Sequence, residues 1–479
     1  MFQLLAEDLS FIQAKVDSWP TSLLNQTLIL NQAVIDSRQV SVGDLFVCLE
    51  GESTDGHNFV ASATAAGAKA LLINTKHLTA VKSRIPQNLS IVILESKDVL
   101  FSLQQLAKLR RQRFKGEVIG VVGSNGKTST KEMLSSLLKC HHGNEAVFAT
   151  AGNLNNHIGL PLSVLAISDW HKFAVLEMGM NHIGEIDLLT QICRPNHVIV
   201  TSIGFEHMEF FESIDEVAMA ELEVLNGMNG GRILYPASAP QQPYLIEIAA
   251  QKQVSIQLFA IVNESPNPNQ AIATGTYSDG WLFSEIQRQS FSLGEYFGEA
   301  MASNLLASIT LILEQQYIPA EQLQDCCKKL KPQIQGRLRI EMMGSTVVVD
   351  DSYNANPDSF RKSILALSEK LKNGRLLCLA GHMAELGHFS QIGHSQVGQY
   401  LKEAKFETVI GCGKSDMKIL LNSFSAEKPL FYFADSALLA SYIKENPNII
   451  KQFDGILIKG SRSAQMERVL PVLREILTE

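Results

Sequence analysis

An apolar run that ends in a glycine turn and continues into a helix-forming segment most constrains what this chain can fold into. Residues 117–122 read EVIGVV, and residues 123–128 form the turn Gly-Ser-Asn-Gly-Lys-Thr. Glycines let backbone N–H groups curl around phosphate oxygens, and a following helix adds its partial positive charge. The expected helix has an apolar face that would anchor the turn to a core: Met133, Leu134, Leu137 and Leu138. The segment predicts a nucleoside triphosphate site.

Chemical roles follow from the residue types in this turn. Lys127 is placed to reach the β- and γ-phosphates, and the hydroxyl of Thr128 is placed to ligate Mg²⁺. The spacing differs from the usual G-x-x-x-x-G-K-[ST], because Val121 stands at the first glycine position. A glycine turn with a solvated lysine is the alternative. The expected nucleotide contacts are Gly123, Ser124, Asn125, Gly126, Lys127, Thr128 and Ser129.

Strand-like and helix-like segments alternate along most of the 479 residues, a length that suits about three domains of ~150 residues each. We expect an α/β protein with a smaller mixed α/β domain over 1–100 and a central P-loop domain with a doubly wound, mainly parallel sheet over 101–330. A Rossmann-like domain is expected over 331–479, after a hinge marked by Pro332 and Gly336. The stretch from about 250 to 297 looks irregular, with NESPNPNQ as its clearest loop.

Composition excludes several classes of protein. Forty-one Lys and Arg against 49 Asp and Glu give a net charge of −8, which disfavours binding to nucleic acid or to anionic membranes. No apolar stretch approaches the ~20 residues that span a bilayer, and the N-terminus MFQLLAEDLSFI lacks the basic region of a signal peptide. Seven cysteines without a C-x-x-C pair suggest buried free thiols rather than disulfides or zinc. We expect a cytoplasmic protein, taken to be a monomer.

Several further segments resemble the Mur ligase family, the ATP-dependent amide-forming enzymes of peptidoglycan precursor synthesis. The turn fits the short form G-x-x-G-[ST]-N-G-K-[ST], and similar segments follow in the family's order over nearly the whole chain. They are DSR at 36–38, DGH at 55–57, GNLNNHIGLPL at 152–162, DSYNANPDS at 351–359, GHMAELG at 381–387 and KGSRS at 459–463. DSYNANPDS is the most specific, and it resembles the branch of the family that uses D-alanyl-D-alanine.

The resemblance implies an amide ligation in two steps. ATP phosphorylates the carboxylate of UDP-N-acetylmuramoyl-tripeptide to an acyl phosphate, which the amine of D-Ala-D-Ala then attacks. It also implies that the N-terminal domain binds the UDP precursor, the central domain binds ATP, and the C-terminal domain closes on ATP and binds the dipeptide. A carboxylate is a poor electrophile, so this chemistry needs cations to offset negative charge.

Metal ligands are expected where two central strands end. Glu177 follows FAVL and His207 follows HVIVTSIG, and both match metal-ligand positions of the family. Thr128 joins them in the expected metal set. The expected catalytic set is Lys127, Glu177, His207 and Glu221. The alternatives are a helix-capping or surface acid for Glu177 and a structural or solvated histidine for His207. Ser202 stands where the family usually has Asn.

The largest departure from the family is Glu221. Counted without gaps from His207, this position is the family's carbamylated lysine, in a helix expected over 215–225 and capped by Ser213 with Glu216. A lysine carbamate is an anion made from CO₂ that helps to hold a second Mg²⁺. Glutamate is a permanent anion, shorter by about three bonds. Two readings stay open: Glu221 supplies the charge without CO₂, or it is solvated and the second metal is weak or absent.

Other site residues are assigned only by the resemblance. Asn304 is expected to contact adenine, Arg337 phosphate, and Asp351 ribose, although Ala300 replaces a histidine of the family and His382 an acid. Expected substrate contacts are Ser37 and Arg38 for the UDP-sugar part, Asn153 and Asn156, and Asn354, Asn356, Lys459 and Arg462 for D-Ala-D-Ala. Ordinary turn residues or caps are the alternative for several of these.

Three other functions remain possible on this sequence: a P-loop protein that uses ATP as a switch, a homologue that binds ligands without turnover, and a sister ligase that adds another amino acid or polyglutamate. The third residue of the tripeptide, diaminopimelate or lysine, is not predicted.

Overall fold

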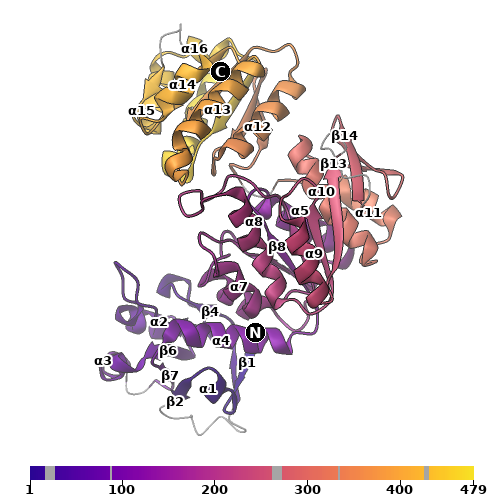
Figure 1. The fold of residues 1–479 in the computed structure, drawn as a ribbon. Helices are drawn as coiled ribbons and strands as arrows, with labels where there is room; N and C mark the ends of the chain where they lie inside the picture. The colour runs from indigo at the N-terminus through magenta and orange to yellow at the C-terminus, as the bar shows by residue number, and fades with distance from the viewer. Residues whose placement is uncertain (17–26, 87–88, 262–271, 333–334, 426–430, 479) are drawn as a thin grey trace.

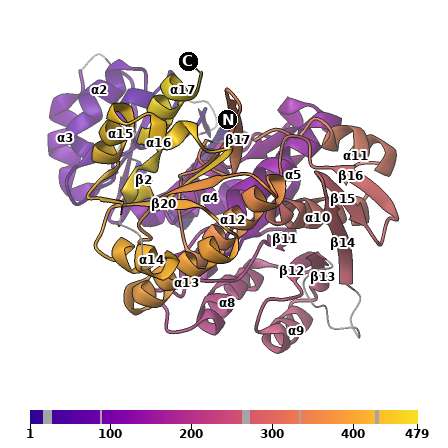
Figure 2. The ribbon, with the colours of Figure 1, turned by 90° about the horizontal axis from the view of Figure 1, so that it is seen from above.

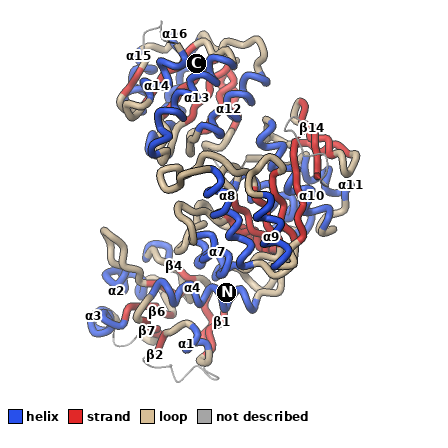
Figure 3. The backbone as a smooth tube through the Cα atoms, viewed as in Figure 1, coloured by secondary structure: helices blue, strands red, loops and turns tan. Residues whose placement is uncertain are grey.

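The computed structural model describes residues 1–16, 27–86, 89–261, 272–332, 335–425 and 431–478. Three α/β bodies follow one another along the chain, with the N-terminal body at the bottom of Figure 1 and the C-terminal body at the top. Figures 2 and 3 show the same arrangement from above and by secondary structure. The predicted α/β architecture is confirmed. Within the described ranges, no helix is both long and apolar enough to cross a bilayer.

The N-terminal body contains an antiparallel pair and a mixed five-stranded sheet. The pair is β1 (Phe2–Leu5) with β3 (Thr27–Leu30). The larger sheet has the order β2 (Ala14–Val16), β7 (Val92–Ser96), β6 (Ala70–Asn74), β5 (Leu45–Val47) and β4 (Ala33–Val34). Only the β2–β7 pair of this sheet is antiparallel. The helices of this body are α1 (Asp8–Phe11), α2 (Val60–Ala65) and α3 (Leu78–Arg84).

The central body is built on a nine-stranded sheet. Its order is β16 (Gln289–Ser292), β15 (Trp281–Ser284), β14 (Ile272–Ser278), β13 (Ser255–Ile261), β12 (Arg232–Pro236), β11 (His197–Val200), β8 (Glu117–Val122), β10 (Phe173–Glu177) and β9 (Val147–Ala149). β14, β15 and β16 form antiparallel pairs, and the other pairs are parallel. The prediction of irregular structure over 250–297 is therefore wrong, because β13–β16 extend the sheet there. NESPNPNQ lies outside the described residues.

Helices cover both faces of this sheet, as a doubly wound fold requires. Alternate side chains of β8 belong to two cores: Ile119 and Val121 pack in one, Val118 and Val122 in the other. The first core includes α5 (Lys127–His142), α10 (Glu299–Glu314) and α11 (Ala320–Cys327). The second includes α4 (Val99–Arg113), α6 (Gly159–Ala166), α7 (Glu185–Cys193), α8 (Ile214–Leu222) and α9 (Gln242–Gln251).

The C-terminal body has a six-stranded sheet that is parallel except at one edge. Its order is β17 (Arg339–Met343), β18 (Thr346–Asp351), β22 (Gly455–Lys459), β19 (Leu376–Gly381), β20 (Thr408–Cys412) and β21 (Tyr432–Phe433), with β17 antiparallel to β18. The helices are α12 (Pro357–Lys370), α13 (Ser390–Glu403), α14 (Met417–Phe424), α15 (Ser436–Glu445), α16 (Asn448–Lys451) and α17 (Leu470–Thr478).

The expectation of free thiols throughout is wrong at one place. Cys140 and Cys326 form a disulfide with their Cα atoms 5.8 Å apart. The last turn of α5 packs against α11, and this packing joins residues that are 186 positions apart in the sequence. The other five cysteines are buried free thiols, as expected.

Candidate active site

A cavity of about 890 Å³ lies where the central and C-terminal bodies meet, a volume in the range of small-molecule sites. The β8–α5 turn, the end of β10 and α10 line it on one side, and segments following β18 and β22 line it on the other. The predicted site residues that line it are Ser124, Asn125, Gly126, Lys127, Thr128, Ser129, Asn153, Asn156, Glu177, His207, Asn304, Arg337, Asp351, Asn354, Asn356, Lys459 and Arg462.

The phosphate loop has the backbone that its glycines predict. Gly123 and Gly126 have φ of 118° and 91°, a region that other residues rarely adopt. A Cβ atom on Gly126 would lie 2.9 Å from the side-chain Nδ2 atom of Asn304, so glycine leaves room for this side chain of α10. Asn304 therefore lies directly against the loop on which a nucleotide would sit.

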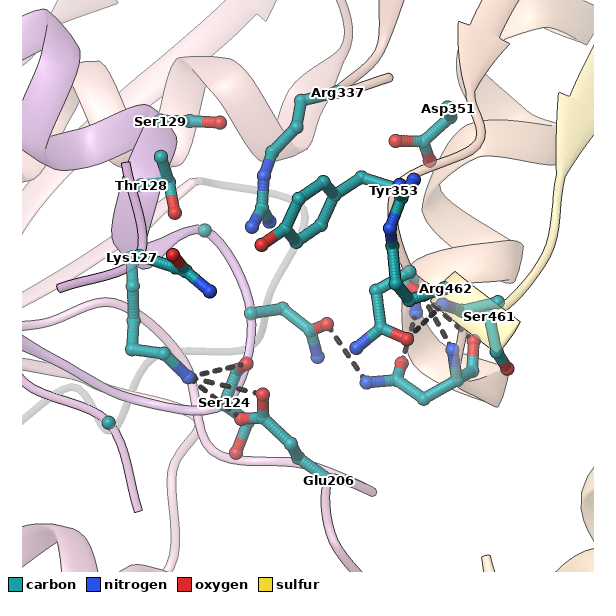
Figure 4. Close-up of a pocket in the computed structure, with 18 of the residues that line it drawn as sticks. Ser124, Lys127, Thr128, Ser129, Glu206, Arg337, Asp351, Tyr353, Ser461 and Arg462 are labelled. Carbon is teal, nitrogen blue, oxygen red and sulfur yellow. Dashed lines mark hydrogen bonds and ion pairs between the residues drawn. The ribbon is translucent and has the colours of Figure 1, made fainter. Parts of the chain in front are cut away.

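Lys127 is the cation at the centre of the loop. Its Nζ donates to the carbonyl oxygens of Gly123 (2.6 Å) and Ser124 (3.2 Å) and to the Glu206 carboxylate at 3.0 Å. Burial works to lower the pKa of Lys127, but the nearby carboxylates, Glu206 first, raise it above its usual value. Glu206 was not predicted as a site residue, because a single acid in a loop carries no motif. Figure 4 shows it beside the Lys127 ammonium.

Glu177 meets the requirements of a metal ligand. Its Oε1 accepts hydrogen bonds from Asn155 Nδ2 at 2.8 Å and from the Thr128 hydroxyl at 3.3 Å. The side chain is buried, and its Oε2 has no hydrogen-bond partner in the described part of the chain. Oε2 instead lies 3.7 Å from the buried Lys131 ammonium, which is an ion pair too long to be a hydrogen bond. A carboxylate oxygen in this state beside a phosphate loop fits Mg²⁺, which prefers oxygen ligands. Asn155 was missed as a site residue although it belongs to the GNLNN segment.

His207 lies between two carboxylates. Its Nε2 is 3.5 Å from Glu206, and its Nδ1 is 2.7 Å from Glu385 of the C-terminal body. Burial works to lower the pKa of His207, but Glu206 and Glu385 outweigh it and raise the pKa to about 9. His207 also has a positive φ of 54°, so its loop holds it in an uncommon backbone conformation. Glu385 was not predicted, although it is part of GHMAELG.

Glu221 lies behind the phosphate loop rather than in the cavity. Helix α8 begins after Ser213, whose hydroxyl accepts the Glu216 N–H as predicted, although the Glu216 carboxylate accepts from Glu212 N–H and not from Ser213. The Glu221 side chain is 1% exposed, and its Oε2 accepts the Gly123 N–H at 2.9 Å. The reading of Glu221 as solvated is therefore wrong. Burial raises its pKa to about 7, against the opposing effect of Lys127.

This raised pKa predicts how Glu221 affects stability. The native state binds the proton more tightly than the unfolded chain, whose pKa is near 4.5, so stability falls as the pH rises from about 4.5 to about 7. Glu221→Gln has no such charge, and we expect it to be more stable than wild type at pH 8 by on the order of 3 kcal/mol, with little difference at pH 4.5. Thermal unfolding of the metal-free protein at both pH values measures this. Exposed Glu212→Gln is the control, and an equal shift at both pH values would contradict the prediction.

Arg337 points into the cavity toward the phosphate loop (Figure 4). Its guanidinium stacks on the Tyr353 ring at 4.1 Å, and its Nε is buried without a hydrogen-bond partner among the described residues. Tyr353 thus fixes the plane of a cation whose N–H donors face the cavity, an arrangement suited to phosphate.

Asp351 and Lys459 are paired with each other at the cavity wall. Lys459 Nζ forms a buried ion pair with Asp351 Oδ2 and also donates to the Asn354 carbonyl at 3.1 Å. Asp351 further accepts from Leu338 N–H and from the Ser363 hydroxyl. Because these groups satisfy one another, their first role in the structure is to brace the wall. Their predicted contacts with ribose and dipeptide stay predictions.

Ser37 and Arg38 lie apart from this cavity, on the N-terminal body. Arg38 is 87% exposed and pairs with Asp36 at 2.7 Å, which lowers the pKa of Asp36 to about 2. In the nearby DGH segment, His57 Nδ1 is hydrogen-bonded to the Asp55 carboxylate at 2.6 Å, and His57 Nε2 accepts the Asn74 N–H at 2.9 Å. His57 is therefore a structural residue of this body.

The structure explains two of the departures from the family pattern. The Ser202 hydroxyl accepts Asn125 N–H and donates to the Asn125 carbonyl, both at 3.0 Å, so it holds the phosphate loop. His382 is buried, does not line the cavity, and hydrogen-bonds the Ser463 hydroxyl at 3.0 Å. Burial lowers the pKa of His382, so it supports the 461–463 turn as a neutral ring. Ala300 lines the cavity without a polar group.

Comparison with known proteins places the chain in a family. Residues 121–312 match the Mur ligase middle domain, 337–462 the Mur ligase glutamate ligase domain, and 31–111 the Mur ligase family catalytic domain. The chain is 33% identical over 473 residues to a UDP-N-acetylmuramoyl-tripeptide–D-alanyl-D-alanine ligase of Escherichia coli, covering 95% of this chain and 97% of that one. The chain belongs to the Mur ligase family. The Bacillus subtilis enzyme of the same name is 31% identical, over 93% and 94% of the two chains.

Solved structures agree with this assignment. A MurF crystal structure from Acinetobacter baumannii is similar with a TM-score of 0.81 and 26% identity over 99% of both chains. MurF ligase from Thermotoga maritima in complex with ADP is similar with a TM-score of 0.76 and 26% identity, over 94% of this chain and 98% of that one. The sequence predicted an amide ligase that uses ATP and Mg²⁺. This prediction is confirmed.

Proposed function

We propose that this Mur ligase joins D-alanyl-D-alanine to UDP-N-acetylmuramoyl-tripeptide in the cytoplasm, giving UDP-MurNAc-pentapeptide, ADP and phosphate. The observation that carries the proposal is the composition of the cavity. The phosphate loop of the central body faces the DSYNANPDS segment of the C-terminal body across it, so nucleotide and amine substrate can meet there. The curated relatives that carry this activity in their names match nearly the whole chain.

In this proposal each of three domains has its own task. Residues 1–100 bind the UDP precursor, residues 101–330 bind ATP, and residues 331–479 close on ATP and bind the dipeptide. Backbone N–H groups of 126–128, where the loop enters α5, and the Lys127 ammonium hold the β- and γ-phosphates. Arg337, held in plane by Tyr353, lies against the phosphates from the opposite wall and offsets their charge. Ser37 and Arg38 remain our candidates for the distant UDP end of the substrate.

Thr128, Glu177 and His207 are the residues that would hold Mg²⁺. When bound there, Mg²⁺ would offset charge on the phosphates and polarise the γ-phosphoryl group. The terminal carboxylate of the tripeptide attacks the γ-phosphorus, ADP leaves, and an acyl phosphate forms. The amine of D-Ala-D-Ala then attacks the acyl carbon, and phosphate leaves as the amide forms. Asn354, Asn356 and Arg462 are our candidates for orienting the dipeptide at the cavity wall.

Mass spectrometry of the UDP-linked product tests this proposal. With UDP-MurNAc-tripeptide, ATP, Mg²⁺ and D-Ala-D-Ala, we expect a product heavier by one dipeptide residue mass. Single amino acids and glutamate offered in place of the dipeptide should give no product. Transfer of glutamate instead would identify a sister ligase, and ATP hydrolysis without any product would identify an ATP switch.

We further propose that Glu221 supplies the negative charge of the family's carbamylated lysine. Its carboxylate is part of the side chain, is buried and accepts a hydrogen bond from the phosphate loop, so no CO₂ is needed to form it. Because its pKa is raised to about 7, it carries its full charge only above that pH. We expect wild-type activity to be the same with and without bicarbonate at limiting CO₂. Glu221→Gln should lose activity about 10- to 100-fold, the scale of a lost site charge. Glu221→Lys should be weak and regain activity when bicarbonate is added. Undiminished activity and Mg²⁺ dependence in Glu221→Gln would contradict the proposal.

A further inference from the structure

Two side chains of the C-terminal body hold the central loop that carries His207. This loop, residues 204–209, follows β11 and precedes α8. Asp358, in the first turn of α12, accepts the Phe205 N–H through Oδ2 at 2.9 Å. Glu385, in the turn after β19, places its Oε2 2.7 Å from His207 Nδ1. Both acids belong to segments, DSYNANPDS and GHMAELG, in which they have no assigned role.

Backbone contacts show that the loop and the C-terminal body are fitted closely. A Cβ atom on Gly204 would lie 2.3 Å from Asp358 Oδ2, so glycine is needed for this approach. The Glu209 N–H donates to the Glu385 carbonyl at 3.0 Å. A Cβ atom on Gly387 would lie 2.9 Å from Glu209 Cα. Main-chain contacts of Glu385 and Gly387 with Glu209 therefore place the Glu385 side chain beside His207.

The two nitrogens of His207 face different partners. Nδ1 lies 2.7 Å from Glu385 and Nε2 lies 3.5 Å from Glu206, and both acids line the cavity together with His207. A histidine that ligates a metal usually donates its other ring N–H to a carboxylate, which fixes the tautomer and makes the free nitrogen more basic. Glu385 approaches off the direction of the Nδ1–H bond, so the contact is an ion pair here. Such hydrogen bonds often tighten only in the loaded enzyme.

We propose that Glu385 and Asp358 are positioning residues that couple docking of the C-terminal domain to metal binding at His207. Glu385 holds the proton on Nδ1 and leaves the Nε2 lone pair for the metal, and Asp358 anchors the loop that presents the ring. The proposal rests on the role of His207 in the proposed function. Because the carboxylate comes from another domain, the metal site is complete only when the two domains are docked. Metal binding and docking must then favour each other to the same extent.

Binding of Mn²⁺ alone to the full-length protein, followed by the electron paramagnetic resonance signal of the free ion, tests this proposal. We expect Glu385→Gln to raise the Mn²⁺ dissociation constant about 10- to 100-fold, the usual effect of losing such a carboxylate. Glu385→Asp should recover part of the affinity, and Asp358→Ala should weaken binding as well. Glu403→Gln, an exposed acid on α13 of the same domain, should bind Mn²⁺ as the wild type does.

Combination with His207→Ala separates a positioning role from a general structural one. If Glu385 acts through His207, Glu385→Gln causes no further loss of Mn²⁺ affinity once His207 is absent. An unchanged dissociation constant in Glu385→Gln, or the same loss with and without His207, would overturn the proposal. No peptide substrate is present, so an error in the proposed ligase specificity would leave this result unchanged and would appear only in the product assay.

Discussion

Lys127→Met is expected to lower the rate of phosphate release by about 100- to 1,000-fold, the scale on which a group that stabilises transition-state charge acts. Its ammonium is the cation that the phosphate loop encloses, bonded to two carbonyl oxygens of that loop and to Glu206. Methionine keeps the length of the side chain but removes the charge that offsets the γ-phosphoryl group. Steady-state kinetics with saturating substrates measures this loss.

The control for Lys127→Met is Lys329→Met, which removes an exposed lysine of the same domain. Removal of Lys127 also leaves the Glu206 carboxylate without its main partner, so thermal unfolding should accompany the kinetics to show that the variant is folded. A folded Lys127→Met enzyme with a rate within threefold of wild type would contradict a phosphate-binding role for this loop.

Glu177→Gln should be the second most damaging substitution. Gln preserves the shape and can still accept from Asn155 and Thr128, but it lacks the negative charge that a divalent cation needs. We expect the Mg²⁺ concentration for half-maximal rate to rise about 10- to 100-fold and the maximal rate to fall as well. Activity measured as a function of Mg²⁺ concentration gives both quantities.

Glu145→Gln, an exposed acid of the central domain, is the matched control for Glu177→Gln. An unchanged Mg²⁺ requirement in Glu177→Gln would show that the Oε2 atom serves only the buried ion pair with Lys131 and is not a metal ligand.

Features set by local sequence could be predicted. The phosphate loop needs only a buried strand, glycines at the positions with positive φ, and a helix with one apolar face, all contained within residues 117–138. Glu177 and His207 were assigned through the resemblance, and the convergence of strand ends at one edge of a parallel sheet supported that assignment. The resemblance added Arg337 and Asn304, which no local pattern would have indicated.

Features that depend on packing between distant segments could not be predicted. Asp351 and Lys459 are 108 positions apart and pair only because β18 and β22 are neighbouring parallel strands. The Glu385–His207 pair depends on how two domains dock, and the Cys140–Cys326 disulfide depends on how α11 packs on α5. The antiparallel edge of the central sheet was missed because its short strands carry weak alternation among polar residues.

Transfer of ¹⁸O from substrate to phosphate tests the central claim most directly. UDP-MurNAc-tripeptide labelled with ¹⁸O in its terminal carboxylate is converted with ATP, Mg²⁺ and D-Ala-D-Ala, and the released phosphate is examined by mass spectrometry. Attack of the carboxylate on the γ-phosphorus predicts one ¹⁸O atom in each phosphate, and release that requires both substrates. Unlabelled phosphate, or phosphate release without the tripeptide, would contradict an acyl-phosphate ligase.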